Sequence, residues 1–430
     1  MQSRKISILG TVGVPANYGG FETLAENLVR HHDSMALTDV LTVYCSGKSY
    51  PTHERSFLSA KLKYIPLNAN GAQSIPYDIW SLFSAVWNRS DVILLLGVSG
   101  AVALPLVRLF SSARIVTNID GIEWRREKWQ GLAKRFLRFS EKMAVRFSHE
   151  VVADNAAIAE YVQRTYGVAA HVIAYGGDHA MAVEAVSVDE YALPEGYAFS
   201  VCRIEPENNV HVILEAFSKL KPNGSFESAQ TLPPFRGRGR LVGTQQGDQV
   251  STLSLALPLQ GGGEGVFDGP GVDVQSLVMV GNWANSEYGR ALRAKYASCA
   301  NLYLLDPIYD LGKLKTLRAG AALYVHGHSA GGTNPSLVEA MHFGKPILAF
   351  DCDFNRATTE DKALFFADGE ALQRLMLDLD RVALDKVGQD MLEIANRRYT
   401  WNIVAQQYFA LMQNSLNQDE IHRPGRGEAA

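Results

Sequence analysis

A stretch in the last third of the chain combines residue types that bind anions. Residues 326–351 read HGHSAGGTNPSLVEAMHFGKPILAFD, with a polar, Gly-rich loop between two apolar segments. Gly331 and Gly332 allow backbone amides to approach a ligand closely. Asn334 and Pro335 are expected to open a helix whose N-terminus faces the same place and favours a negative charge. The pattern predicts a phosphate or nucleotide site, although an ordinary strand–helix turn with a proline-opened helix looks the same.

A second Gly-rich loop lies near the N-terminus in the same strand–loop–helix setting. The apolar run Lys5–Gly10 leads into TVGVPANYGG, and an amphipathic helix is expected over Phe21–His31. Gly19 and Gly20 stand directly before that helix, where they suit a phosphate or a sugar lying against the backbone. The loop lacks the GxGxxG spacing, so the sequence gives little support to a dinucleotide site.

Acidic side chains follow a third expected strand, Arg114–Asn118. Asp120 and Glu123 come directly after it. The carboxyl ends of parallel strands meet at the edge of a sheet where α/β proteins bind ligands, so both side chains are well placed for one. A turn residue before Gly121 is an equally good explanation of Asp120.

The elements that must position these loops alternate between apolar strands and helices, which predicts an α/β protein with doubly wound parallel sheets. We expect one Rossmann-like domain over residues 1–175 and a second over 196–398, joined by a linker over 176–195. A helix over 399–416 and a disordered tail over 417–430 follow. The expected strands are Lys5–Gly10, Val40–Cys45, Leu62–Leu67, Val92–Leu96, Arg114–Asn118, Glu150–Ala153, His171–Ile173, Ala198–Ile204, Leu277–Val280, Asn301–Leu305, Ala321–Val325 and Pro346–Phe350.

Composition sets the broad class. The 430 residues are 47% hydrophobic and 20% charged, typical of a soluble globular protein. A net charge of -4 gives no reason to expect nucleic acid as a partner. The four cysteines are widely scattered without metal spacing, which indicates buried free thiols in a reducing cytoplasm. The N-terminal apolar run is too short for a signal peptide.

Two segments depart from the α/β pattern. Residues 222–276 are rich in Gly, Ser, Gln and Pro with little periodicity, which predicts a mostly disordered insertion into the second domain. Residues 124–147 carry eight Lys or Arg interleaved with aromatic and aliphatic residues. Such a helix suits an anionic membrane surface, and equally a core-facing helix with a solvated basic face.

Three motifs in order resemble retaining glycosyltransferases of family 4, which have the GT-B fold. They are VPANYGGFETLAENLV, VCRIEPENNVHVILEAF and NPSLVEAMHFGKPILAFD. With DGIEWRREKW and HGHSAGGTNPSLVEAM, they are more similar still to a bacterial rhamnosyltransferase-like subgroup. The resemblance covers nearly the whole chain except 222–276 and the tail. It implies two domains facing a cleft, with the C-terminal helix crossing back to the N-terminal domain.

The resemblance assigns roles to particular residues. Glu339 is expected to accept hydrogen bonds from the donor ribose, the alternative being a solvent-facing helical glutamate. Arg203 is expected to neutralise the donor diphosphate, the alternative being a structural ion pair. Gly19 and Gly20 would face donor phosphates and acceptor, and Asp120 would bind an acceptor hydroxyl. The remaining candidates for binding the substrate lie in the second loop: His328, Gly331, Gly332, Thr333 and Asn334.

Two positions depart from the family's pattern. The basic residue expected five positions after Arg203 is Asn208, and the carboxylate expected eight positions before Glu339 is Gly331. Backbone amides of residues 329–333 are candidates to replace the lost contacts. His328 suits a contact to phosphate or base, and equally a structural role.

The implied activity is transfer of a sugar, first of all rhamnose from dTDP-rhamnose, with retention, to a growing lipid-linked cell-surface glycan. The partners are therefore a nucleotide-sugar donor and that glycan, in the cytoplasm or at the inner face of the plasma membrane. No cofactor or essential metal is expected, because the one DxD pair at a strand end, Asp351 and Asp353, is interpreted as a turn. The leaving phosphate can take the acceptor proton, so no catalytic dyad is needed. The alternatives are a non-catalytic GT-B scaffold in a polysaccharide assembly complex and a GT-B nucleotide-sugar epimerase.

Overall fold

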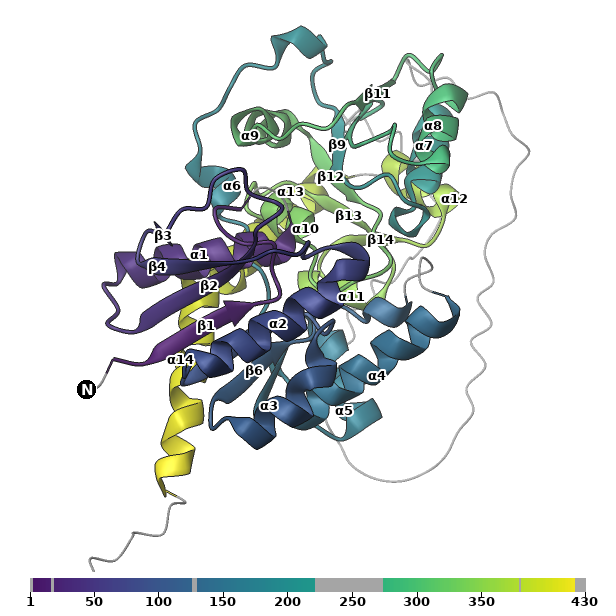
Figure 1. Cartoon of the computed structure of the whole chain (residues 1–430). Helices are drawn as coiled ribbons and strands as arrows, with labels where there is room; N and C mark the ends of the chain where they lie inside the picture. The colour runs from purple at the N-terminus through teal and green to yellow at the C-terminus, as the bar shows by residue number, and fades with distance from the viewer. Residues whose placement is uncertain (1–2, 17–18, 126–129, 221–273, 379, 422–430) are drawn as a thin grey trace, which may run out of the picture.

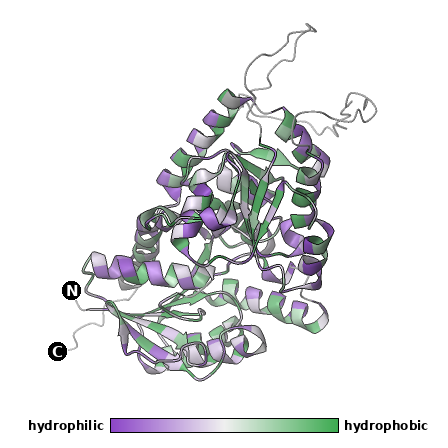
Figure 2. Ribbon diagram, turned by 90° about the horizontal axis from the view of Figure 1, so that it is seen from above, coloured by the Kyte–Doolittle hydropathy of each residue, from purple (hydrophilic) through white to green (hydrophobic). Residues whose placement is uncertain are grey.

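The computed structural model describes residues 3–16, 19–125, 130–220, 274–378 and 380–421. The expected disordered tail lies outside this part of the chain from residue 422 on, as does most of the expected insertion over 222–276. The described residues form two α/β domains, each built on one sheet (Figure 1). Figure 2 shows the strands of the sheets as mainly hydrophobic, whereas most of the covering helices have both a hydrophobic and a hydrophilic side.

The N-terminal sheet has eight strands in the order β3-β4-β2-β1-β5-β6-β7-β8 and is parallel except for β3. Its central strands are continuous apolar runs because both faces are covered; all five residues of β5 are buried. The strands are β1 (Lys5–Leu9), β2 (Val40–Ser46), β3 (Ser56–Phe57), β4 (Ala60–Ile65), β5 (Val92–Leu96), β6 (Arg114–Asn118), β7 (Glu150–Ala153) and β8 (His171–Val172).

Helices cover the two faces of this sheet unequally. One face packs against α1 (Gly20–Ser34) and the C-terminal helix α14 (Trp401–Ile421). The other face packs against four helices in a row: α2 (Ser74–Trp87), α3 (Leu104–Phe110), α4 (Gly131–Phe147) and α5 (Ala156–Tyr166). Residues 126–129 of the basic segment lie outside the described part of the chain.

The C-terminal sheet has six parallel strands in the order β11-β10-β9-β12-β13-β14. They are β9 (Ala198–Val201), β10 (Leu277–Val280), β11 (Leu302–Leu305), β12 (Leu323–His326), β13 (Ile347–Phe350) and β14 (Leu364–Phe366). One face is covered by α7 (Val210–Ser218), α8 (Glu287–Lys295) and α12 (Gly369–Leu377). The other is covered by α9 (Leu311–Gly320), α10 (Pro335–Met341) and α13 (Arg381–Arg398), and α11 (Asp353–Thr359) contacts α5 of the first domain.

The expected end of the insertion at residue 276 is wrong by three residues. Val274 is buried in the core of the second domain. The Gln275 carbonyl accepts from Asn301 Nδ2 at 2.9 Å, and the Ser276 carbonyl accepts from the Ala198 amide at 2.8 Å. These three residues belong to the domain because they anchor the start of β10 beside β9.

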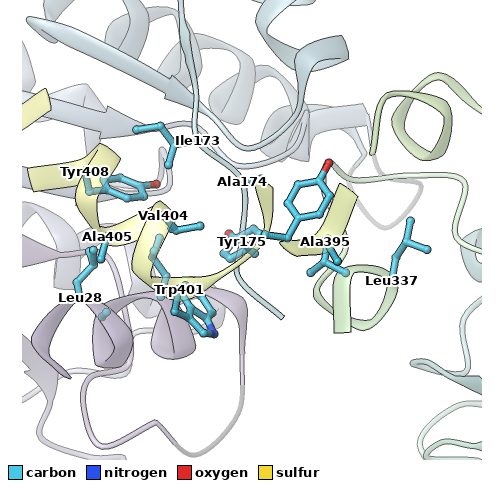
Figure 3. Close-up of a cluster of buried hydrophobic side chains, with 14 of the residues drawn as sticks. Leu28, Ile173, Ala174, Tyr175, Leu337, Ala395, Trp401, Val404, Ala405 and Tyr408 are labelled. Carbon is cyan, nitrogen blue, oxygen red and sulfur yellow. The ribbon is translucent and has the colours of Figure 1, made fainter. Parts of the chain in front are cut away.

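The crossing helix ties the domains together as expected, but it extends to Ile421 instead of ending at residue 416. Its sequence contains neither Gly nor Pro between Trp401 and Ile421, so no breaker stops it earlier. Figure 3 shows Leu28 of α1, Leu337 of α10 and Trp401 of α14 within one buried cluster. The two domains therefore share part of their hydrophobic core.

Both sheets change winding direction next to their first strand. In the N-terminal sheet β2 and β5 flank β1, and in the C-terminal sheet β10 and β12 flank β9. Ligands of doubly wound proteins bind at the carboxyl ends of strands at such switch points. The loop after β1 contains Gly19 and Gly20, the loop after β12 contains Gly331 and Gly332, and Arg203 follows β9. The topology thus places the two Gly-rich loops where a ligand site is expected.

Candidate functional site

Arg203 lies two residues beyond β9 with its side chain 46% exposed. Its Nη1 is 3.9 Å from Glu205 Oε1, so the alternative of an ion pair is partly realised. An exposed pair at this distance contributes little free energy, which leaves the guanidinium able to bind an anion. Asn208 is 1% exposed and donates from Nδ2 to the Arg203 carbonyl at 2.7 Å. Asn208, which replaces the expected basic residue, therefore has a structural role, because it fixes the backbone that presents Arg203.

The loop after β12 interlocks with the same segment. Asn209 Nδ2 donates to the Gly327 carbonyl at 2.9 Å. The amide and Oγ of Ser329 both donate to the Glu207 carbonyl, at 3.0 and 2.8 Å. The expectation that the amides of residues 329–333 bind a ligand is therefore wrong for Ser329, whose amide already has a carbonyl partner. These bonds hold the loop and Arg203 in one rigid unit.

Asn334 and Pro335 open α10 as the sequence indicates. The Asn334 side chain accepts from the Ser336 amide at 3.1 Å and from Ser336 Oγ at 2.8 Å, and Pro335 takes the first helical position. Asn334 thus acts as the N-cap residue, which satisfies a helix-terminal amide. A contact from Asn334 to a substrate stays a prediction.

Glu339 on α10 is tied to two residues that are remote in sequence. Arg318 of α9 is 4% exposed and forms a close ion pair with Glu339 Oε2. His179 of the short helix α6 (His179–Ala182) places Nε2 3.3 Å from Glu339 Oε1. Trp401 Nε1 donates to His179 Nδ1 at 2.9 Å, so Nε2 of that ring carries the proton that faces Glu339.

The carboxylate of Glu339 is held in its charged form. Burial, the largest influence, raises its pKa, but Arg318, His179 and His342 together lower the pKa below the usual range. The alternative of a solvent-facing glutamate is wrong, because the side chain is 16% exposed and lies against Arg318. A carboxylate has about four acceptor positions, so a vicinal diol can still bind to it.

The loop after β1 is shaped by a buried glutamate. Glu22 Oε1 accepts from the Val12 amide at 2.7 Å and from Thr11 Oγ1 at 3.2 Å. Gly19 has φ 129°, and a Cβ there would lie 1.9 Å from Glu22 Oε2, so only glycine fits. A Cβ at Gly20 would lie 3.5 Å from the Tyr175 ring. Gly19 is therefore required by the path of the loop, whether or not a ligand is bound, whereas a side-chain carbon at Gly20 would make only an ordinary contact with Tyr175.

Asp120 adopts a positive φ of 56° and receives a hydrogen bond from Tyr175 Oη at 3.4 Å. The strained backbone agrees with a turn, and the Tyr175 contact places the carboxyl group toward the domain boundary. Nearby Asp154 is buried, and its pKa is raised well above the usual value by burial and then by the charge of Asp120. Asp154 is absent from the sequence-based candidates because it resembles an ordinary strand-end residue.

The loop after β12 touches the N-terminal domain at the carboxyl ends of β6 and β7. A Cβ at Gly121 would lie 3.1 Å from Gly331, and one at Gly332 would lie 2.0 Å from Asp154 Oδ1. Thr333 Oγ1 donates across the boundary to the Asp154 carbonyl at 2.5 Å. The structure thus brings together Asp120, Gly331, Gly332 and Thr333, with Asp154 as a residue that the sequence did not suggest.

His326 was expected to be the first residue of the loop. In the structure it is the last residue of β12. Its ring is buried and stacks at 6.0 Å on Tyr324 and at 4.5 Å on His328. Burial lowers the pKa of His326 to about 3, so the ring is neutral. The stack favours a structural role for His328, whose contact to a ligand stays a prediction.

Comparison with known proteins identifies the architecture. Residues 3–178 match the sequence model of a domain described as a domain of unknown function, DUF1972. No curated protein sequence matches the chain. Sucrose-phosphate synthase from Thermosynechococcus elongatus is similar in structure, with a TM-score of 0.69 and 14% identity over 96% of this chain and 100% of that one. The expected GT-B fold is confirmed.

Two further structures show how widely this fold is shared. HepE from Anabaena, in complex with UDP-glucose, has a TM-score of 0.61 and 14% identity over 96% of this chain and 99% of that one. A protein from Listeria monocytogenes, named as a candidate UDP-N-acetylglucosamine 2-epimerase, has a TM-score of 0.56 and 12% identity over 97% and 98%. The same fold thus occurs in a sucrose-phosphate synthase and in an epimerase candidate, so the function of this chain must be argued from its site.

Proposed function

We propose that the chain is a nucleotide-sugar-dependent glycosyltransferase. The observation that supports this best is the grouping at one switch point of Arg203, the loop 327–333 and the charged carboxylate of Glu339. A half-exposed arginine and a fixed carboxylate suit the diphosphate and the ribose of one ligand. Facing them across the domain boundary are the Gly19–Gly20 loop and Asp120, which would meet the acceptor.

Each group has a defined part in the proposed reaction. The acceptor oxygen forms a bond to the anomeric carbon of the donor while the bond from that carbon to the phosphate oxygen breaks. Arg203 stabilises the charge that develops on the departing nucleoside diphosphate, and this effect lowers the barrier because the charge is largest late in the reaction. The leaving phosphate takes the acceptor proton, so the proposed reaction needs no enzyme base, and by the resemblance it needs no protein nucleophile. Asp120 orients the acceptor hydroxyl.

The finer assignment rests on the sequence resemblance. It names rhamnose from dTDP-rhamnose as the first choice of donor, retention at the anomeric carbon, and a lipid-linked glycan at the inner face of the plasma membrane as acceptor. Within the described residues no helix is long and apolar enough to cross a membrane.

The decisive experiment offers the protein labelled dTDP-rhamnose, UDP-glucose and GDP-mannose with a bacterial lipid extract. We expect transfer of one sugar to the organic phase, and the anomeric configuration of the product is read by NMR. If the protein neither transfers a sugar nor binds a nucleotide, the proposal is wrong.

Two alternatives have specific support. The structural bonds of Asn208 and Ser329 suit a scaffold that has lost its ligand, and calorimetry with dTDP and UDP tests this, because a scaffold should bind neither. The fold is also that of the Listeria protein named as an epimerase candidate. Epimerisation or hydrolysis of the donor without acceptor would favour that alternative.

A further inference from the structure

The helices on the outer face of the N-terminal sheet present an unusual surface. Helices α2, α3 and α4 lie side by side across this face, with α3 in contact with both α2 and α4 (Figure 1). Each exposes large apolar side chains although each also buries a separate face against the sheet. The exposed residues are Trp80, Phe83 and Trp87 on α2, Leu106, Leu109 and Phe110 on α3, and Leu132 and Phe139 on α4.

Their spacing makes them continuous ridges. The α2 residues stand at i, i+3 and i+7 and the α3 residues at i, i+3 and i+4, so each set occupies one side of its helix. Trp87 is 88% exposed, Leu109 73% and Phe110 69%. Side chains of this size are costly to leave in water, and so many together on one face indicate a surface that something apolar covers.

The charges on this surface have one sign. On α4, Arg135, Lys142 and Arg146 share an outward stripe with Leu132 and Phe139. The carboxyl groups within α2, α3 and α4 belong to Asp78 and Glu141, and both are buried. Every charged side chain that these helices expose is therefore a cation.

We propose that this surface, made of α2, α3 and α4, docks on an anionic lipid bilayer. The apolar ridges of α2 and α3 would enter the interface, and the cations of α4 would meet the lipid headgroups. The basic segment 124–147 accounts for only part of the surface; the aromatic ridge of α2 and the apolar ridge of α3 come from residues outside it.

The geometry of the fold connects this surface to the cleft. Helix α4 follows β6 through Asp120, so its first turn, with Leu132, lies toward the edge of the sheet where Asp120 stands. A bilayer against α4 would therefore lie near Asp120, the residue proposed to meet the acceptor. This last step rests on the proposed function, whereas docking itself does not.

Sedimentation with vesicles tests the docking directly. We expect the full chain to bind phosphatidylcholine vesicles that contain phosphatidylglycerol, and to bind much less to pure phosphatidylcholine or at high salt. Each cation near an anionic surface contributes about fivefold to binding, so the triple variant R135E/K142E/R146E should bind more weakly by on the order of 100-fold. The triple variant W87S/L109S/F110S should also lose binding, by a similar factor.

Two controls separate docking from misfolding and from self-association. L377S/V382S removes exposed apolar side chains from the second domain and should bind vesicles like the original protein. Trp87→Phe should retain binding but lose part of the tryptophan quenching by brominated lipids. Equal binding to neutral vesicles would overturn the proposal. So would unchanged binding by both triple variants, or a dimer in dilution-dependent sedimentation that W87S/L109S/F110S abolishes. Nucleotide binding by the variants reports on the proposed function separately.

Discussion

Asp78 and Asp154 of the N-terminal domain and Glu339 of the C-terminal domain are buried carboxyl groups held in opposite states. In the N-terminal domain burial raises the pKa of Asp78 to about 8 and that of Asp154 well above its usual value. In the C-terminal domain Arg318, with two histidines, outweighs burial and lowers the pKa of Glu339. The first domain therefore carries carboxyl groups that keep their protons, and the second carries a carboxylate that stays charged.

The two domains therefore differ in the charge of their buried carboxyl groups. Asp78 and Asp154 are buried, and while they keep their protons they add no negative charge that would repel the phosphates of a donor. The C-terminal side adds Arg203, half exposed, and the buried pair of Arg318 and Glu339. An exposed cation in a long ion pair and a fixed carboxylate in the same domain suit a ligand that carries both a diphosphate and a ribose. This difference agrees with the proposal that the donor binds to the C-terminal domain.

The substitution with the largest expected effect on this contrast is Glu339→Ala. Removing the carboxylate leaves the Arg318 guanidinium buried without its main partner, and loss of one member of a buried pair costs about 3–5 kcal/mol of unfolding free energy. Urea unfolding measures this loss. Donor binding should weaken by about 1–3 kcal/mol as well, because a polar contact is lost.

The double variant E339A/R318M is the matched control for stability. It removes both charges, so most of the unfolding free energy should return while donor binding remains weak. If Glu339→Ala unfolds like the original protein, the charged pair does not hold α9 and α10 together. The contrast between the buried carboxyl groups of the two domains is then wrong.

Arg203→Ala should have the next largest effect, on the rate of transfer. Loss of a group that stabilises developing charge typically lowers kcat by a factor of about 10²–10³. Stability should change little, because the side chain is half exposed and its pair with Glu205 is long. Steady-state kinetics with the best donor measures the effect.

Glu205→Gln tests whether the weak ion pair matters. It removes the partner of Arg203 without removing the cation, so kcat should remain close to that of the original protein.

An Arg203→Ala enzyme with full activity would show that the diphosphate is bound elsewhere. The proposed position of the donor would then be wrong.

The sequence predicted the fold well because the pattern it depends on is local. The strands Val92–Leu96, Arg114–Asn118, Glu150–Ala153 and Leu277–Val280 have the bounds that the sequence predicts, because each is built around a local apolar run. The boundary of the insertion at residue 276 was wrong because Val274 has its burial partners in distant segments. The strand β14 and the helices α11 to α13 were not assigned, since their patterns are short or weakly periodic.

The site was predicted only as far as single motifs allow. The glycines and Glu339 lie in loops and a helix that the sequence already outlines. Arg318 and His179 went unnoticed because they approach Glu339 from other elements, 21 and 160 positions away in the chain. Leu314 and Leu317 did mark the buried face of α9, and a charged Arg318 next to them was an available signal for a buried ion pair.

The remaining prediction concerns the pH dependence of stability. The pKa of Asp78 rises from an ordinary 3.8 to about 8 on folding, because burial penalises the charged form. The folded state therefore binds a proton more tightly than the unfolded state does. The stability that this group contributes is complete below about pH 4 and is lost as the pH rises toward 8, by at most ~1.4 kcal/mol per pH unit.

Asp78→Asn removes that loss, so its unfolding free energy should fall less steeply between pH 5 and pH 8 than that of the original protein. Asp33→Asn alters an exposed carboxyl group of the same domain and should leave the slope unchanged. Glu339→Gln should differ in the opposite sense. The lowered pKa of Glu339 stabilises the fold above its ordinary value of 4.5, and this contribution is lost as the pH falls through the folded pKa. If the unfolding free energies of Asp78→Asn and the original protein change with pH in parallel, Asp78 is charged when folded. The buried carboxyl group of the N-terminal domain would then resemble Glu339 of the C-terminal domain.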